Sequence, residues 1–372
     1  MKIKPFLLER YFAKYEFSAP ILLSCSDAEP YSLSELMQLA DEETRMLWQE
    51  LSLGYTESQG HPLLREEIAS LYPHKRADQI ITVVPEEGIF LAMQVLLESG
   101  GHVITTFPGY QSLYEIANAL GSQVSKWQPN ADTLQFDVGE LQKLVRKNTK
   151  LIVINFPHNP TGALITQEQL EQVLSIAREN NLYVFADEMY RYLEFDQADR
   201  LPSVCEQYEN SIVLGGMSKS FALAGLRSGW LVINRSDLLK KVNELKDYTT
   251  ICGSAPSEIL ALIGLRAKET IIQRNRAIID TNLAVLDNFF IQYQNMFDWQ
   301  KPKAGTVAFP RLTAPMPIDD FCRRLMEEKG VMLLPASVFD YPANRFRFGF
   351  GRSAFAQGLQ HLETFINQTL KR

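Results

Sequence analysis

Two cations stand in an otherwise uncharged, largely apolar segment, GGMSKSFALAGLRSGW (Gly215 to Trp230). Lys219 lies between the apolar runs SIVLGG and FALAGL, which leave little exposed surface for the turn that carries it. Burial destabilises the cationic form of a lysine, so its amine is a candidate Schiff-base nucleophile; a lysine in a surface loop is the alternative. Arg227 is a permanent cation that suits a planar, bidentate anion, and either a phosphate or one buried carboxylate would serve.

Polar side chains also follow two predicted strands. Asp187 ends the apolar run LYVFAD, Tyr190 follows three residues later, and Asn159 lies in the turn NFPHNPTG (Asn155 to Gly162). Asp187 would either cap the next segment or pair with a cation, and Asn159 would either serve the turn or project an amide donor. Because open α/β sheets bind ligands at the carboxyl ends of their strands, the functional alternatives place all three side chains at one crevice.

The run RFRFGF (Arg345 to Phe350) alternates with a period of two. This pattern predicts a strand whose phenylalanines face the core, so that Arg345 and Arg347 share the opposite face. That face is either an exposed cationic surface or a clamp for a carboxylate.

The elements that would position these residues follow an alternating pattern between about residues 80 and 235. Six short β-branched runs predict strands that are apolar on both faces: QIITVV, HVITTF, LIVINF, LYVFAD, SIVLGG and GWLVIN. Helical periodicity lies between them, at Glu86 to Ser99, Tyr110 to Leu120 and Gln167 to Asn180, and Thr166 with Gln169 forms a capping-box signature before the last. The alternation predicts an α/β domain with a mostly parallel sheet.

The pattern changes after about residue 265. A long helical stretch, Lys268 to Met296, precedes two strand-like runs, a helix near Asp319 to Lys329 and a closing helix. These elements predict a smaller α+β domain. We expect a large domain over residues 46–265 and a small domain from residues 1–45 and 266–372.

Composition excludes several classes of function. The 372 residues carry a formal net charge of -7, without the basic patch typical of nucleic-acid binding. No apolar run approaches the length of a membrane helix, and the amino terminus lacks the apolar core of a signal peptide. The four cysteines form no metal-binding or disulfide pattern. We therefore expect a cytoplasmic protein with small-molecule substrates, no metal, no nucleic-acid partner and no membrane contact.

Taken together, these motifs resemble the class I/II aminotransferases, the fold-type-I group of pyridoxal phosphate enzymes. The resemblance rests on NPTG, ADEMY, SKSFALAGLRSGW and FRFGFGR in that order, within a stretch from about Tyr55 to Arg352. It implies a large domain with a mostly parallel sheet between helices, a smaller α+β domain, and transfer of an amino group from an amino acid to a 2-oxo acid.

The resemblance also implies a role for each matching residue. Lys219 would form the internal aldimine and then carry the proton, Asp187 would pair with the pyridinium nitrogen, and Arg347 would hold the substrate α-carboxylate. Further cofactor contacts are implied for Arg227 and Ser218 (phosphate), Tyr190 and Asn159 (ring hydroxyl), Tyr110 (ring face) and Tyr55 (the phosphate of the partner subunit in a homodimer). Asn159 would also lie beside the substrate.

Three stretches depart from the family pattern; one is PASVF, from Pro335, where the pattern P-G-x-x-F is usual, and the other two concern predicted site residues. VVPEEG places Glu86 and Glu87 where small residues usually surround the phosphate. We expect these side chains to point away from the phosphate, while one or two backbone amides of the cofactor site donate hydrogen bonds to it. In LSCSDAEP, Asp27 and Glu29 are either solvated loop acids or part of the substrate site, where they would favour a cationic side chain.

Two alternatives remain open. The same residues could support another reaction of pyridoxal phosphate, such as β-elimination or the cyclisation or oxidation of an arginine derivative. In a different class, the protein could bind the cofactor or an amino acid without turnover.

Overall fold

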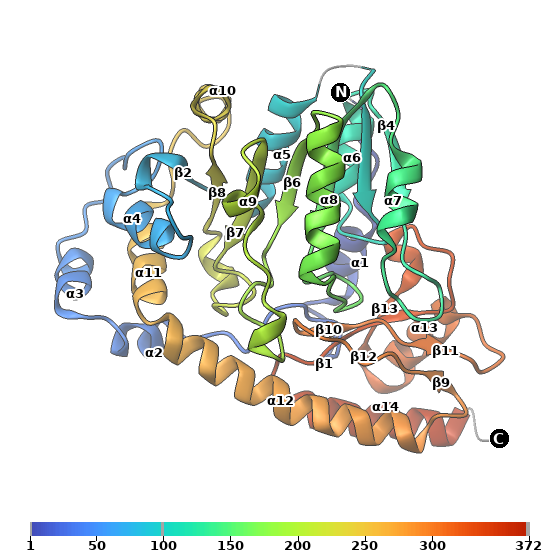
Figure 1. Cartoon of the computed structure of the whole chain (residues 1–372). Helices are drawn as coiled ribbons and strands as arrows, with labels where there is room; N and C mark the ends of the chain where they lie inside the picture. Colours follow the sequence, from blue (N-terminus) through green and yellow to red (C-terminus); the bar gives the residue numbers. More distant parts are fainter. Residues whose placement is uncertain (1, 98–99, 370–372) are drawn as a thin grey trace.

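A seven-stranded sheet forms the centre of the protein, which we describe from a computed structural model over residues 2–97 and 100–369 (Figure 1). The strand order is β2-β8-β7-β6-β5-β3-β4. Strands β3 to β7 run parallel to one another, whereas β8 is antiparallel to both β7 and β2. The expected, mostly parallel sheet is confirmed. Its strands are β2 (Ile80–Val83), β3 (His102–Thr106), β4 (Gln123–Trp127), β5 (Thr149–Asn155), β6 (Tyr183–Asp187), β7 (Ser211–Gly216) and β8 (Gly229–Ile233).

Strand β4 was not predicted. It is the outermost strand beside β3, and Gln123 at its start is exposed. An edge strand needs no continuous apolar run, so QVSKW carries a weaker signal than the buried strands.

Helices cover both faces of the sheet. One face packs against α5 (Pro85–Leu96), α6 (Ser112–Ala119) and α10 (Ser236–Lys246). The other packs against α7 (Val138–Leu144), α8 (Gln167–Glu179) and α9 (Val204–Gln207). The capping box of α8 is present: Thr166 and Gln169 each accept a hydrogen bond from the other's backbone N–H.

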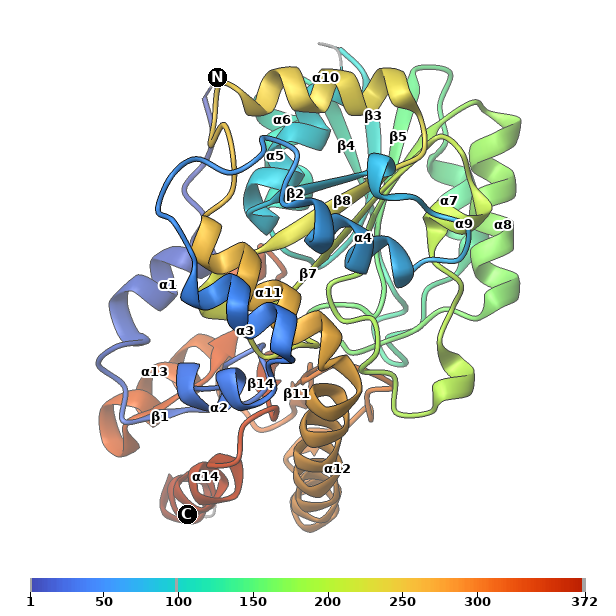
Figure 2. The ribbon, with the colours of Figure 1, turned by 90° about the vertical axis from the view of Figure 1, so that its left-hand side faces the viewer.

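A second helical group lies beside β2 and β8 (Figure 2). Here α11 (Ala255–Arg266) contacts α2 (Leu33–Gln38), α3 (Glu42–Gln49) and α4 (Pro62–Ser70). The long helix α12 (Lys268–Gln292) runs from α11 to the C-terminal helix α14 (Phe355–Thr369) (Figure 1). The predicted apolar face of α14 is buried, with Phe355, Leu359, Leu362 and Ile366 in the core.

Short strands and α13 (Ile318–Lys329) form the smaller part of the fold. Strand β14 (Phe346–Gly349) lies between β10 (Val307–Ala308) and β13 (Leu334–Pro335), while β11 (Arg311–Leu312) pairs with β9 (Phe297–Asp298). The N-terminal segment joins this part: β1 (Ile21–Leu22) pairs with β12 (Val331–Met332), and α1 (Leu7–Tyr15) packs on the 3-10 helix η4 (Ala336–Phe339). Three further 3-10 helices are η1 (Ala77–Gln79), η2 (Gln197–Asp199) and η3 (Ala224–Leu226). The expected domain boundaries stay a prediction.

Within residues 2–97 and 100–369, no helix combines the length and apolar character needed to span a bilayer. The four cysteines are unpaired, and three of them are buried.

Candidate active site

A cavity of about 370 Å³ lies at the carboxyl ends of the central strands. Its walls come from α1, the loop after β1, the start of α5, the ends of β5, β6 and β7, and β14. Tyr55 and Glu87 do not line it. The structure does bring together the other predicted site residues: Asp27, Glu86, Tyr110, Asn159, Asp187, Tyr190, Ser218, Lys219, Arg227 and Arg347.

Lys219 follows β7 and reaches into this cavity. Its Nζ donates to Ser26 Oγ at 2.7 Å, and no carboxylate of the described residues lies within ion-pair distance. The surface-loop alternative is therefore wrong for Lys219, since this residue is half-buried and lines the cavity.

Asp187 ends β6 and is buried. Its Oδ1 accepts from the backbone N–H of Met189 at 3.1 Å, and its backbone carbonyl accepts from Asn155 Nδ2 at 3.0 Å. Burial raises the pKa of this carboxyl to about 6, although its bond to Met189 and the nearby Lys219 act in the opposite direction. A buried carboxylate of this kind would be stabilised by a cation placed in the cavity.

Arg347 is a buried guanidinium without a carboxylate partner among the described residues. Only 1% of it is exposed; it donates to Asn159 Oδ1 at 3.2 Å and to the carbonyl of Ser24 at 2.8 Å, and its Nε has no partner. Burial lowers its pKa. An incoming carboxylate would supply the missing acceptor, as the clamp interpretation requires.

The alternative of an exposed cationic strand face is wrong for both arginines. Arg345 is also buried, and it donates to the carbonyls of Phe309 and Ala131. Alternation predicts which residues share a face, but it does not show that other elements cover that face.

Gly349 permits the close approach that completes this wall. A Cβ atom there would lie 1.9 Å from the carbonyl oxygen of Cys25. The glycine in FRFGFGR thus lets the segment that carries Ser24, Ser26 and Asp27 lie directly against β14.

Two tyrosines, Tyr110 and Tyr190, line the cavity. The Tyr110 hydroxyl donates to Glu9 Oε1 at 3.2 Å, and its ring lies 4.9 Å from that of Phe6. The Tyr190 hydroxyl donates to the carbonyl of Ser26 at 3.0 Å. The oxygen of the Asn159 side chain is taken by Arg347, which leaves its amide donors without a partner in the described part of the chain.

Arg227 and Ser218 also line the cavity. Arg227 is exposed, it is held at a φ of 52°, and it donates only to the carbonyl of Ala224, at 3.0 Å. No carboxylate of the described residues pairs with it, so the alternative of a buried ion pair is wrong. A non-glycine residue at positive φ is strained and is often held so for a functional reason.

The side chains of the two acids at the start of α5 point in different directions. Glu87 accepts hydrogen bonds from Thr249 and Thr250, outside the cavity, as expected. The expectation that both side chains point away is wrong for Glu86, which lines the cavity and accepts from Ser112 Oγ. Burial raises the pKa of Glu86, which lessens the repulsion that its charge would impose on a phosphate. The N–H groups of the first helical turn have no intrahelical acceptors, so those of Glu86 and Glu87 remain potential donors.

Asp27 lines the cavity and is not a solvated loop acid. It pairs with Arg352, whose Nη2 lies 2.9 Å and 3.1 Å from its two carboxylate oxygens. Glu29 lies outside the cavity and accepts from Ser353 N at 2.7 Å.

Sequence reasoning missed several residues of the cavity. Ser26 and Arg352 lie next to motifs but carry no strong pattern of their own. One group of missed residues belongs to α1 and its C-cap: Leu8, Glu9, Phe12 and Glu16. Their helical spacing on one face is the signal that could have identified them.

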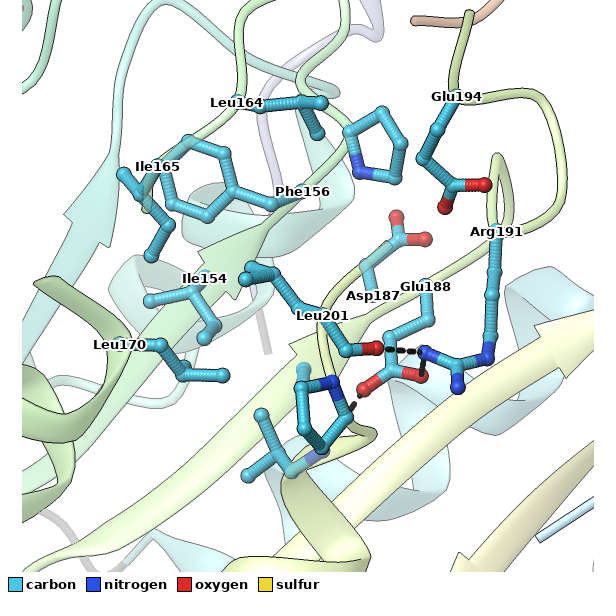
Figure 3. A pocket seen from close by; sticks show the side chains of 14 residues that line it. Ile154, Phe156, Leu164, Ile165, Leu170, Asp187, Glu188, Arg191, Glu194 and Leu201 are labelled. Carbon is cyan, nitrogen blue, oxygen red and sulfur yellow. Dashed lines mark hydrogen bonds and ion pairs between the residues drawn. The ribbon is translucent and has the colours of Figure 1, made fainter. Parts of the chain in front are cut away.

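A smaller cavity lies next to the Asp187 strand end (Figure 3). It holds about 30 Å³ and is lined mainly by apolar side chains. Beside it, Arg191 donates to the carbonyl of Leu201 at 2.7 Å and lies 3.7 Å from Glu188. This space admits a water molecule but no substrate.

The larger cavity fits pyridoxal phosphate in the chemistry of its side chains. It offers the amine of Lys219, a buried carboxylate for a cationic ring nitrogen, and Arg227 with helix-start amides for a phosphate. No group of three or more His, Cys, Asp or Glu residues in the described part of the chain is arranged to hold a metal ion.

Comparison with known proteins agrees with this chemistry. The sequence profile described as aminotransferase class I and II matches residues 28–356. The chain belongs to this family. Its fold is that of the fold-type-I pyridoxal phosphate enzymes, and it is a pyridoxal-phosphate-dependent aminotransferase.

Individual relatives are moderately similar to this aminotransferase. The aspartate aminotransferase of Sulfolobus acidocaldarius is 28% identical over 341 residues, which cover 85% of this chain and 83% of the relative. The capreomycidine synthase of Streptomyces vinaceus is 28% identical over 352 residues, covering 94% and 88%. A solved structure of a PLP-dependent aminotransferase from Streptococcus suis superposes with a TM-score of 0.92 at 31% identity and covers 99% of both chains.

Proposed function

We propose that Lys219 is the covalent attachment point of the cofactor and the group that moves the proton as the aminotransferase converts an amino acid to a 2-oxo acid. The observation that carries this proposal is the meeting of three groups in one cavity: the Lys219 amine, the buried Asp187 carboxylate and the Arg347 guanidinium with its unpartnered Nε. When bound, pyridoxal phosphate supplies a conjugated ring that accepts the electrons released at the substrate α-carbon.

The protein groups would divide the remaining work. Asp187 would keep the ring nitrogen protonated, because a buried carboxylate favours an adjacent cation. Asn159 and Tyr190 would donate to the ring hydroxyl, and Tyr110 would cover the ring face. Arg347 would hold the substrate α-carboxylate, which orients the α-hydrogen toward Lys219 Nζ for transfer.

Phosphate binding would use the other side of the cavity. Arg227 would donate through two nitrogens, Ser218 through its hydroxyl, and Glu86 and Glu87 through their backbone N–H groups. The raised pKa of Glu86 is compatible with this arrangement.

We further propose a homodimer in which Tyr55 reaches the phosphate bound by the partner. Tyr55 is 91% exposed, and Leu53 (83%) and Tyr248 (88%) are also exposed, as expected for apolar residues that a second subunit covers. Glu258 supports the Tyr55 loop by accepting from Thr56 Oγ1 and His61 N, both at 3.1 Å. The unpaired cysteines support a cytoplasmic location.

Visible absorption of the protein with added pyridoxal phosphate tests the role of Lys219. We expect the wild-type protein to develop a visible absorption band whose position or intensity changes when an amino acid is added. We also expect the wild-type protein to transfer the amino group to a 2-oxo acid. Lys219→Ala should reduce the rate of this transfer by at least about 1000-fold. Lys241→Ala, which changes an exposed lysine on α10, is the matched control. Full transfer by Lys219→Ala, or ammonia release in place of transfer by wild type, would contradict the proposal.

A further inference from the structure

One face of α1 forms a wall of the cavity. Leu8, Glu9 and Phe12, together with the C-cap residue Glu16, all line it. Leu8, Phe12 and Glu16 follow the i, i+4, i+8 spacing of one helix face, and Glu9 lies three residues before Phe12 and seven before Glu16, so this side of the helix combines apolar groups with two carboxylates.

The two α1 carboxylates have no cationic partner of their own. Glu9 accepts only from the neutral Tyr110 hydroxyl, and no ion pair involves Glu9 or Glu16 among the described residues. Partial burial raises the pKa of Glu16, and the charges of Glu9 and Asp27 raise it further, although Arg352 and Lys219 partly offset them. Glu9 and Glu16 are therefore two neighbouring acids of the cavity without a paired cation, whereas Asp27 is paired with Arg352.

The cations of the cavity are already committed elsewhere. Arg352 is neutralised by Asp27, and Arg347 faces Asn159 and Ser24. The proposed roles of Lys219 and Arg227 are with the cofactor. Among the described residues that line the cavity, none remains to bind a second substrate carboxylate, as a dicarboxylic amino acid would require.

Arg347, whose guanidinium carbon lies 5.9 Å from the centre of the Phe12 ring, gives an independent sign that an anionic ligand group binds beside this wall. It is buried, it points into the same cavity, and its Nε has no partner. A ligand that satisfies both Arg347 and the carboxylates of Glu9 and Glu16 carries a carboxylate at one end and a positive charge at the other.

We propose that the amino donor is an amino acid with a cationic group at the end of its side chain, a guanidinium or an ammonium, bound by Glu9 and Glu16 of α1. This inference rests on the proposed function and names the substrate class of the same site. The methylene groups of such a side chain would pack on Leu8 and Phe12, while its charge meets the two carboxylates.

L-Arginine and L-citrulline provide a direct test, because they differ mainly in replacing a guanidinium with a neutral urea group. With the cofactor-loaded enzyme and a 2-oxo acid acceptor, we expect arginine to exceed citrulline in kcat/KM by at least about 30-fold, the scale of a charge-assisted contact. Glu16→Gln and Glu9→Gln should each reduce that ratio by about 10-fold. Glu168→Gln removes the same charge from an exposed position on α8 and should leave the ratio unchanged.

Calorimetric binding of both amino acids to the cofactor-loaded protein supplies a readout that needs no turnover. Preference for arginine that falls in both variants supports the subsite even if transfer is slow. Equal binding of arginine and citrulline, or an unchanged ratio in two folded variants, overturns it. Transfer from neutral or acidic amino acids with no preference for arginine would leave the aminotransferase function intact and refute only this inference, whereas absence of transfer from every amino acid tested would refute the proposed function.

Discussion

Replacing Asp187 with asparagine should stabilise the cofactor-free protein while impairing the enzyme. The carboxyl is buried at the end of β6, where the pKa rises from 3.8 to about 6. The folded state therefore binds a proton more tightly than the unfolded state. Stability linked to this group is highest below pH 3.8 and is lost as the pH rises through the folded-state pKa near 6.

The expected magnitude follows from that rise. At about 1.4 kcal/mol per pKa unit, the raised pKa of Asp187 costs about 3 kcal/mol of stability at pH 8 and about half of that at pH 5. Asparagine has nearly the same shape, and its side-chain oxygen can still accept from Met189 N. Asp187→Asn should therefore raise the free energy of unfolding by up to these amounts at the two pH values.

Urea unfolding of the cofactor-free proteins at pH 5 and pH 8 measures this difference. Asp280→Asn changes the same chemistry at an exposed position on α12 and is the control. The cofactor-loaded variant should lose amino transfer by on the order of 100-fold or more. The reasoning would be refuted if Asp187→Asn were less stable than wild type at pH 8, or if the difference in unfolding free energy between the two proteins were the same at both pH values.

Two further substitutions test the ends of the site. Arg347→Lys keeps the charge but loses the planar fork, so KM for the amino acid should rise about 10- to 100-fold in steady-state kinetics; an unchanged KM would place the α-carboxylate elsewhere. Tyr55→Phe should weaken cofactor binding by roughly 10-fold in equilibrium dialysis while the mass in solution remains that of a dimer; unchanged affinity would contradict a role for this hydroxyl across the interface.

Most of the fold and most of the site residues could be predicted from local motifs. Strands such as LYVFAD are continuous apolar runs, and Lys219 and Asp187 lie directly after or within them, so their positions follow from short stretches of sequence. The resemblance to a family added roles that spacing alone left open.

What the sequence did not predict depends on distant contacts. The burial of Arg345 comes from elements that cover the second face of β14, and the α1 wall depends on segments far along the chain. Period-two and helical patterns show which residues lie on one face, but they do not identify the partner of that face.

The attachment of the N-terminal segment has a consequence for folding. Ile21 in β1 pairs with Val331 in β12, and the bond from Arg347 to the Ser24 carbonyl spans 323 residues. Closing such long loops is slow, because the chain loses entropy before the contacts form. The N-terminal segment that forms this wall of the cavity is therefore synthesised first but packs against the rest of the fold last. We expect a nascent chain to complete its central sheet before this wall docks, so that a chain cut short before β12 would keep the sheet residues of the site while its first 20 or so residues stay unattached.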